Sequence, residues 1–210
     1  RLFNDTLRFK ERALQKMLDI IRISPQNRPL FFYQNITFLN SNTQKKINNP
    51  AELILNTSYW ITWIGNFGNW KHIINNIPSP NECAPLLLTQ VDWSFKIMSG
   101  NQCAQIYFDD YFESIIPNKK GGYNIFNVFI NNYLLIIRQY IDKKSIIQKE
   151  KYRLFRYFLL KWISSLKNSN KDFTFEKNNI WNILMKEYWY CPYFYIGLIF
   201  LYIKNIIAKK

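Results

Sequence analysis

Short apolar runs separated by helical patterns constrain the fold of this chain more than any other feature. Turn-forming residues such as Pro, Asn and Gly bound the runs, which is typical of buried strands. The runs comprise residues 30–33, 59–64, 86–89 and 104–108, with 115–117 as a further candidate. They lack the strict alternation that an antiparallel sheet with one wet face would show. They therefore predict an α/β fold, in which helices cover both faces of a small parallel sheet.

Helical patterns lie between the apolar runs. The first is an amphipathic pattern of Phe3, Leu7, Leu14, Leu18 and Ile21. Further short helices are expected from Pro50, from Asn69 to Ile77 and from Trp93 to Met98. Proline suits a first helical turn, and the Asn69 side chain suits a helix cap. The polar stretch 40–49 is typical of a loop.

From Ile125 onward the pattern is helical only. The expected helices span residues 125–141, 143–166, 175–189 and 192–207. We therefore divide the chain into an α/β domain, residues 1–142, and a basic, aromatic helical extension, residues 143–210.

The charge balance points to a polyanionic partner. Lys and Arg number 28 against 14 Asp and Glu, so the formal net charge is +14. Such an excess favours RNA, DNA or an acidic lipid surface, although a basic protein that is merely soluble is the alternative. Ile, Asn, Lys, Phe and Tyr, the residues of A/T-rich codons, are abundant, which indicates a small organellar genome.

The sequence contains little that predicts catalysis or metal binding. Cys83, Cys103 and Cys191 are too far apart for a Cys-x-x-Cys pattern, and His72 is the single histidine. A zinc site is therefore not expected, and an odd number of cysteines fits a reducing compartment. We expect neither an enzyme nor a cofactor.

Two other short motifs contain residue types that can bind metals or phosphates. Asp109, Asp110 and Glu113 form an acidic cluster that we interpret as a solvated strand end rather than a metal site. Gly121-Gly122 follows two lysines but lacks the Gly-x-x-x-x-Gly-Lys pattern of a phosphate loop. Neither motif changes the expectation of a protein without catalytic or metal sites.

The stretch from Tyr59 to Lys71 carries a family resemblance. It reads Tyr-Trp-Ile-Thr-Trp-Ile-Gly-Asn-Phe-Gly-Asn-Trp-Lys. This resembles the signature of the second protein of the small ribosomal subunit, in which a strand ends in Trp-Ile/Leu-Gly-Gly and Thr-Asn-Trp/Phe-Lys follows at a helix start. Here Asn66 replaces the second glycine, and the segment before Asn69 is one residue shorter.

The order of the flanking segments is similar to that family as well, over roughly residues 5–142. The matching segments are 13–23, 29–33, 85–88, 92–98, 104–109, 115–118 and 125–141. The departures are a missing N-terminal Gly-x-His-x-Gly-His segment, a helical hairpin reduced to residues 77–84, and a turn at 117–120 without the usual Gly-Asn-Asp. Residues 143–210 have no counterpart in the family and resemble an acquired extension.

The resemblance implies a flavodoxin-like fold and a structural role in a mitochondrial small ribosomal subunit. The expected partners are the small-subunit rRNA and neighbouring ribosomal proteins near the junction of head and body, with no small-molecule substrate. A separate polypeptide is a candidate for the missing N-terminal segment. No transit-peptide pattern opens the sequence, so we expect a protein of the mitochondrial matrix that is organelle-encoded or has lost its presequence.

Nine residues are the candidate RNA contacts. They are Trp63, Asn69, Trp70, Lys71, Lys119, Lys120, Arg153, Arg156 and Lys161. The lysines and arginines suit phosphate contacts, whereas each tryptophan suits either base stacking or packing. The alternative function is a subunit of a mitochondrial inner-membrane complex, anchored by the apolar segment from Pro192 to Ile207.

Overall fold

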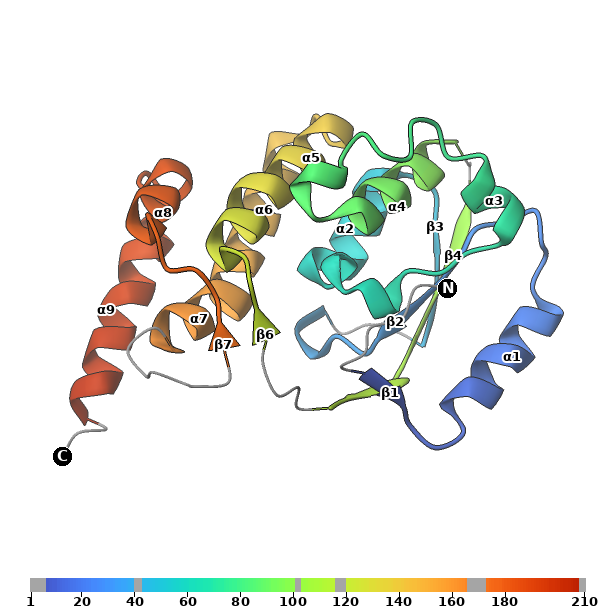
Figure 1. Cartoon of the computed structure of the whole chain (residues 1–210), viewed down its shortest axis with the longest axis horizontal. Coiled ribbons are helices and arrows are strands. Elements are labelled where there is room, and N and C mark those ends of the chain that lie inside the picture. The colour runs from blue at the N-terminus through green and yellow to red at the C-terminus, as the bar shows by residue number, and fades with distance from the viewer. Residues whose placement is uncertain (1–6, 40–42, 101–102, 116–119, 166–172, 208–210) are drawn as a thin grey trace.

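The computed structural model describes residues 7–39, 43–100, 103–115, 120–165 and 173–207 of the 210-residue chain. It is a mixed α/β structure (Figure 1). Helix α1 and the largest sheet lie toward one end of the molecule, and helices α8 and α9 lie at the other. The predicted α/β class is therefore confirmed.

The largest described sheet has three strands in the order β2-β4-β3. Strands β2 (Leu30–Gln34) and β4 (Ala104–Asp109) are parallel and confirm two predicted strands. Strand β3 (Gln44–Ile47) pairs with β4 in the antiparallel direction, so the sheet is mixed rather than all-parallel. The prediction of a loop over residues 40–49 was therefore wrong where β3 lies. This edge strand buries only Ile47 and gives no apolar signal.

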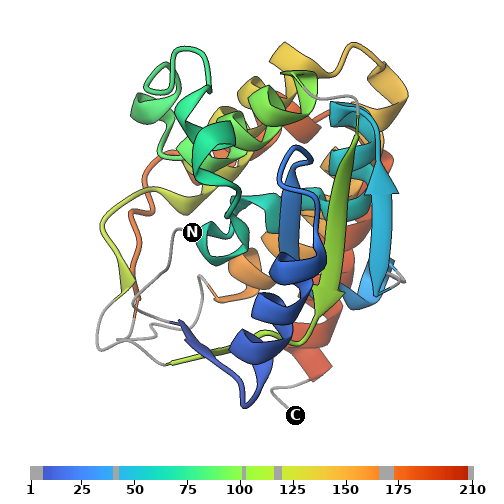
Figure 2. The same ribbon diagram turned by 90° about the vertical axis from the view of Figure 1, so that its right-hand side faces the viewer.

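Both faces of the sheet are buried, as the sequence predicts. Phe31 and Tyr33 of β2 belong to the main hydrophobic core, whereas Leu30 and Phe32 face a second, smaller core with Ala13 and Met17 of α1 (Ala13–Ile23). In Figure 2, α1 stands in front of the strands. Helices α2 (Pro50–Thr57) and α4 (Thr89–Gly100) contribute to the main core on the other side.

Two predicted strands are helical turns instead. Residues 59–64 fall in η2 (Ser58–Thr62) and η3 (Ile64–Asn66), and residues 86–89 fall at the end of η4 (Ala84–Leu86) and the start of α4. In both stretches the backbone bonds locally, as from Trp63 N to Trp60 O at 3.1 Å. Their β-branched and aromatic content reflects packing rather than a backbone preference.

The N-terminal helix is shorter than predicted. Leu7 lies in strand β1 (Leu7–Phe9), which pairs with β5 (Phe112–Ser114), and Phe3 lies outside the described residues. Leu14 is 51% exposed, because the buried face of α1 is formed by Ala13 and Met17.

The candidate strand 115–117 is not confirmed: Ile115 follows the end of β5, and the other two residues are not described.

The start of α2 shows why its prediction succeeded. Asn49 Oδ1 accepts a hydrogen bond from the Glu52 backbone N–H at 2.8 Å, and Pro50 occupies the first turn. Glu52 Oε2 accepts in return from the Asn48 backbone N–H at 2.9 Å. This reciprocal arrangement satisfies donors that the first turn leaves free.

The C-terminal half is predominantly helical, as predicted. One helix runs through η5 (Asn127–Asn132) and α5 (Tyr133–Tyr140), and a second through α6 (Lys144–Leu154), η6 (Phe155–Leu159) and α7 (Leu160–Ser165). Helix α8 (Ile180–Tyr188) begins five residues later than expected, and α9 (Pro192–Ile207) has the predicted bounds. A short parallel pair, β6 (Lys120–Gly121) and β7 (Phe173–Thr174), precedes α8.

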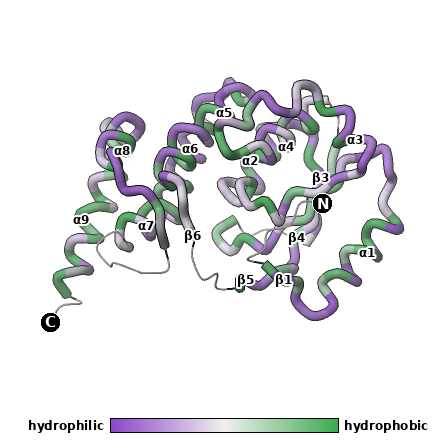
Figure 3. The backbone as a smooth tube through the Cα atoms, in the orientation of Figure 1, coloured by the Kyte–Doolittle hydropathy of each residue, from purple (hydrophilic) through white to green (hydrophobic). Residues whose placement is uncertain are grey.

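The main core is continuous across position 142. Ile137 of α5 and Leu154 of α6 belong to the same buried cluster as Phe31 of the sheet. Helix α9 also packs closely at Gly197, where a Cβ would stand 2.7 Å from Cε1 of Phe155. Figure 3 shows hydrophobic residues along α9, which lies at the C-terminal end of the molecule.

Candidate nucleic-acid interface

The segment that carries the family resemblance forms a compact turn beside the sheet. A Cβ at Gly65 would stand 2.6 Å from Cδ1 of the buried Leu7, so a larger residue here would displace the Leu7 side chain. Asn66 is fully buried, donates from Nδ2 to the Trp60 carbonyl at 2.9 Å and accepts from the Gln34 backbone N–H at 3.4 Å. Gly65 therefore lies close to β1, and Asn66 links the turn to the end of β2.

Asn69 does not cap a helix, contrary to the prediction. The helix α3 (Lys71–Asn75) begins one residue later than a cap at Asn69 would require. Asn69 Oδ1 instead accepts from the backbone N–H groups of Leu30, at 3.4 Å, and Trp70, at 3.0 Å. Asn69 thereby links this turn to the first residue of β2.

The two candidate tryptophans have packing contacts. Trp70 donates from Nε1 to the Arg28 carbonyl at 2.9 Å, and its side chain packs against the smaller core. Trp63 meets Trp60 edge to face with ring centroids 4.7 Å apart, and it packs against the same core. Lys71 is exposed at the start of α3. Of the candidates in this segment, Lys71 is the one whose charge faces solvent.

The basic candidates of the extension have different environments. Arg153 is partly buried and donates from Nη1 to the Leu55 carbonyl at 2.9 Å. Burial lowers the pKa of its guanidinium, although nearby Glu150 opposes this effect. Arg156 and Lys161 are exposed and make no ion pair within the described chain. Lys119 lies outside the described residues, and Lys120 is described only as part of β6.

The acidic cluster of the sequence is neutralised by N-terminal cations. Asp109 accepts from Lys16 Nζ at 2.9 Å, and Glu113 accepts from Arg8 Nε at 2.6 Å. Asp110 forms an ion pair with Lys10. The Lys16 contact lowers the pKa of Asp109 more than burial raises it. This corner of the molecule, around β1, α1 and the end of β4, therefore has little charge to offer a polyanion.

Other exposed cations have no carboxylate partner among the described residues. They are Arg28, Lys45, Lys46, Lys71, Lys143, Lys144, Lys149, Arg156, Lys161, Lys177, Lys186 and Lys204. Five of them lie on one continuous helix, from α6 to α7, or at the residue before it. Among the described residues, charge is therefore unevenly compensated: the corner around β1 and α1 is neutralised, whereas five cations on or just before the helix from α6 to α7 have no carboxylate partner.

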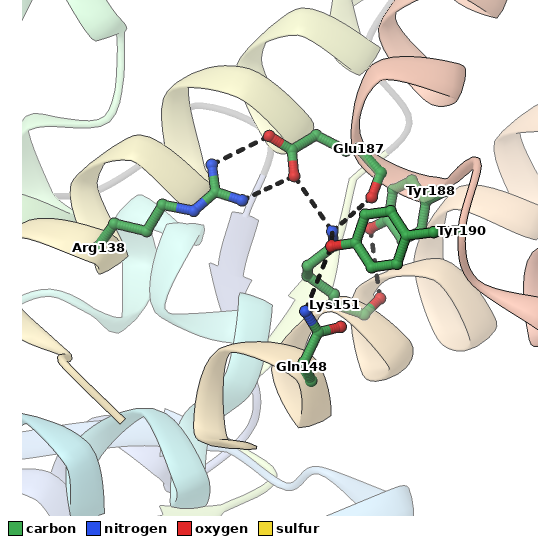
Figure 4. A network of polar contacts seen from close by, with 6 residues as sticks. All are labelled: Arg138, Gln148, Lys151, Glu187, Tyr188 and Tyr190. Atoms are coloured by element: carbon green, nitrogen blue, oxygen red, sulfur yellow. Dashed lines mark hydrogen bonds and ion pairs between the residues drawn. The ribbon is translucent and has the colours of Figure 1, made fainter. Parts of the chain in front are cut away.

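One lysine of the extension is structural. Lys151 is fully buried, lies over the ring of Tyr190, and donates from Nζ to Glu187 Oε2 at 3.2 Å and to the Tyr190 hydroxyl at 2.7 Å (Figure 4). Arg138 contacts both carboxylate oxygens of Glu187, at 3.0 and 2.7 Å. Burial acts to raise the pKa of Glu187, but hydrogen bonds from Arg138 and Lys151 outweigh it and lower this pKa.

An aromatic pocket also lies at the junction of the sheet and the helical half. Its volume is about 400 Å³, and it is lined by Asn35, Thr37, Phe38, Tyr59, Trp60 and Tyr157. The residues come from the segment after β2, from η2 and from η6. Sequence reasoning missed this site because its members lie on three distant segments and form no linear motif.

The chain matches no known family model, no curated protein and no solved structure in the comparisons made. Within the described ranges, no three His, Cys, Asp or Glu side chains are grouped to hold a metal ion. In the same part of the chain, no helix has the length and apolar character needed to cross a membrane.

Proposed function

We propose that this chain is a structural RNA-binding protein of a mitochondrial small ribosomal subunit, without catalytic activity. The observation that carries the proposal is the set of exposed cations on the helix from α6 to α7 that have no carboxylate partner within the described ranges, in a chain of net charge +14. Neutralising RNA phosphates releases condensed counterions, which makes such a surface bind RNA strongly at low salt.

The resemblance of Tyr59–Lys71 to the signature of the second small-subunit protein supports the ribosomal part of the proposal. The order of segments supports it in part, since α1, β2, the signature and β4 follow one another as in that family. Residues 85–88, matched to a family strand, lie in and after the helical turn η4 instead. The signature itself forms helical turns here rather than a strand end. The flavodoxin-like relationship is accordingly part of the proposal, supported by the parallel β2–β4 pair within a sheet buried on both faces.

We assign the phosphate contacts to exposed cations. Arg156 and Lys161 are the principal ones on the extension, and Lys71 is the one beside the signature turn. Lys45 and Lys46 on the edge strand β3 are additional candidates that the sequence did not indicate. Lys151 is excluded from this role because it is fully buried.

The contacts to neighbouring ribosomal proteins are assigned to α8 and α9. One face of α9 exposes Ile196, Ile199, Phe200, Ile203 and Ile207, a spacing that aligns them along the helix. Trp181 and Trp189 at α8 are also more than half exposed. Large apolar and aromatic surfaces of this kind mark sites where proteins meet. Cross-links from Lys186 and Lys204 to other ribosomal proteins in the assembled particle would be the direct check.

The electrostatic part is tested by neutralising Arg156 and Lys161 together. For a structured fragment of small-subunit rRNA, R156Q/K161Q should weaken binding and reduce the slope of log K against log salt concentration. If each side chain neutralises one phosphate, the slope falls by roughly 1.4–1.8, since each contact contributes about 0.7–0.9. The measurement is fluorescence anisotropy across a salt series.

The matched control is K10Q/K16Q, which removes the same net charge from the neutralised corner. Because Lys10 and Lys16 already face Asp110 and Asp109, this control should leave the slope close to that of the unaltered protein. Equal reductions in both double variants would mean that net charge alone, rather than the helical surface, governs binding. Failure of the unaltered protein to bind the rRNA fragment would contradict the proposed function.

A further inference from the structure

Four aromatic rings form a staircase at the pocket between the sheet and the helical half. The ring of Phe38 stacks on Tyr157 with centroids 4.2 Å apart and planes 8° from parallel. Phe38 and Tyr59 are 5.8 Å apart at 16°, and Tyr59 and Trp60 are 6.1 Å apart at 25°. The planes of successive rings are thus nearly parallel, and this geometry allows a further flat ring to stack on them.

The staircase is not closed off by packing. Tyr157 keeps 43% of its surface exposed, although its ring contacts Phe38. The open volume of about 400 Å³ lies beside these rings, and its size falls within the roughly 300–1,000 Å³ of small-molecule sites. Rings that served only as core would have less surface left in solvent.

Two exposed polar side chains line the pocket beside the rings. Asn35 and Thr37 line it and are both exposed, so an amide and a hydroxyl can donate to and accept from the rim of a bound ring. Arg156, exposed and unpaired among the described residues, immediately precedes Tyr157. Asn35 directly follows β2, so the pocket lies beyond the carboxyl end of a parallel strand pair, where open α/β sheets usually bind ligands.

We infer that this pocket holds one unpaired nucleobase of an RNA strand, stacked on the Tyr157–Phe38 pair. Asn35 and Thr37 then contact the edge of the base, and Arg156 contacts the adjoining phosphate. This inference rests on the proposed function and extends it, because it gives the protein a site for single-stranded RNA in addition to a phosphate-binding surface. Stacking on aromatic side chains is the usual way in which proteins hold splayed-out RNA bases.

The test compares two substitutions of one ring in the full-length chain. Tyr157→Phe keeps the ring, whereas Tyr157→Leu keeps apolar contact with Phe38 but removes stacking. Tyr157→Leu should weaken binding of a short single-stranded RNA by roughly 5- to 100-fold, the range expected for the loss of one base–aromatic stack. Tyr157→Phe should bind like the unaltered protein. Tyr152→Leu, at a 42% exposed tyrosine on the same helix, is the control and should also bind normally.

Photo-cross-linking with 4-thiouridine in the same RNA gives an independent readout. Cross-links on the peptides that carry Phe38, Tyr59 or Tyr157 support the inference, and cross-links confined to other peptides overturn it. Should Tyr157→Leu unfold, Asn35→Asp places a negative charge at the exposed rim and is expected to weaken binding without disturbing the core.

Different results would contradict the nucleobase pocket and the proposed function. Equal affinities of Tyr157→Leu and Tyr157→Phe, with salt-dependent RNA binding retained, would overturn the pocket and leave the proposed function standing. Displacement of the RNA by an uncharged hexose, but not by a nucleoside monophosphate, would also overturn it. If the unaltered protein binds neither single-stranded nor structured RNA at low salt, both the pocket and the proposed function are wrong.

Discussion

Replacing Glu187 with glutamine is expected to destabilise the folded chain by roughly 3 kcal/mol, because it leaves a buried ammonium group without its counter-charge. Lys151 is fully buried, and its carboxylate partner is Glu187, whose Oε2 lies 3.2 Å from Nζ. The Tyr190 hydroxyl and the Glu187 carbonyl remain as neutral partners of Lys151, but neither carries a negative charge. Arg138 loses the same carboxylate, which adds to the effect.

Replacing Lys151 instead of Glu187 is expected to destabilise the folded chain much less. Lys151→Met keeps a long side chain in the same space, and Glu187 retains both contacts to Arg138, at 3.0 and 2.7 Å. Because Glu187 keeps Arg138 as its counter-charge, the substitution leaves no buried charge unpaired, so a change within about 1 kcal/mol is expected. Urea unfolding followed by circular dichroism measures both variants. A Lys151→Met loss as large as that of Glu187→Gln would show that the lysine itself, rather than an unpaired charge, governs stability.

A second buried carboxyl group should make stability depend on pH. Glu150 is almost fully buried between η2, α5 and α6, and burial raises its pKa to about 8. Hydrogen bonds to Oε1 from Ser58, at 3.0 Å, and Tyr133, at 2.9 Å, together with the nearby charge of Arg153, oppose this rise only in part. Oε2 has no partner among the described residues. The folded state therefore favours the protonated form of this side chain.

The sign of the effect follows from the raised pKa. The stability contributed by protonated Glu150 is fully present below the pKa of the unfolded chain, near 4.5, and is lost as pH rises toward about 8. Glu150→Gln mimics the protonated form, so it should leave stability nearly unchanged near pH 4.5. It should raise the free energy of unfolding by a few kcal/mol at pH 8 and above, since one pKa unit corresponds to about 1.4 kcal/mol.

Urea unfolding at several pH values checks this expectation. Glu176→Gln, at an exposed position, is the control and should give no pH-dependent difference of comparable size. Destabilisation of Glu150→Gln at pH 8 would contradict the assignment and would mean that Glu150 acts as an ionised partner of Arg153.

Part of this fold follows directly from local sequence. The runs at 30–33 and 104–108 predict strands because both are short, apolar and bounded by turn residues, and both are buried in a sheet covered on two sides. The start of α2 follows from Asn49, Pro50 and Glu52, which form the capping contacts themselves. Helix α9 follows from a long apolar segment that begins at a proline.

Other elements depend on tertiary contacts that leave no local signal. Strand β3 is formed by the polar residues Gln44, Lys45 and Lys46, and it exists because β4 offers an open edge. Residues 59–64 have strand composition, but their rings pack in the core and in the aromatic staircase while the backbone forms helical turns. In both cases the backbone conformation depends on what the segment packs or pairs with, and not on its residue types.

The candidate site, like the fold, could be predicted from the sequence only in part. The sequence identified the basic character of α6 to α7, and Arg156 and Lys161 are exposed there. It could not separate them from Lys151, whose burial depends on Glu187, 36 residues further along the chain. Nor could it bring Phe38, Tyr59 and Tyr157 into one pocket, because their proximity results from packing of the sheet against the helical half.

Sedimentation tests most directly whether this chain belongs to a mitochondrial small ribosomal subunit. A mitochondrial lysate is separated on a sucrose gradient, and the protein is followed by mass spectrometry. Membership predicts co-migration with the small-subunit rRNA and a shift to lighter fractions after RNase treatment or magnesium removal. Migration with a detergent-solubilised membrane complex, unchanged by RNase, would contradict it.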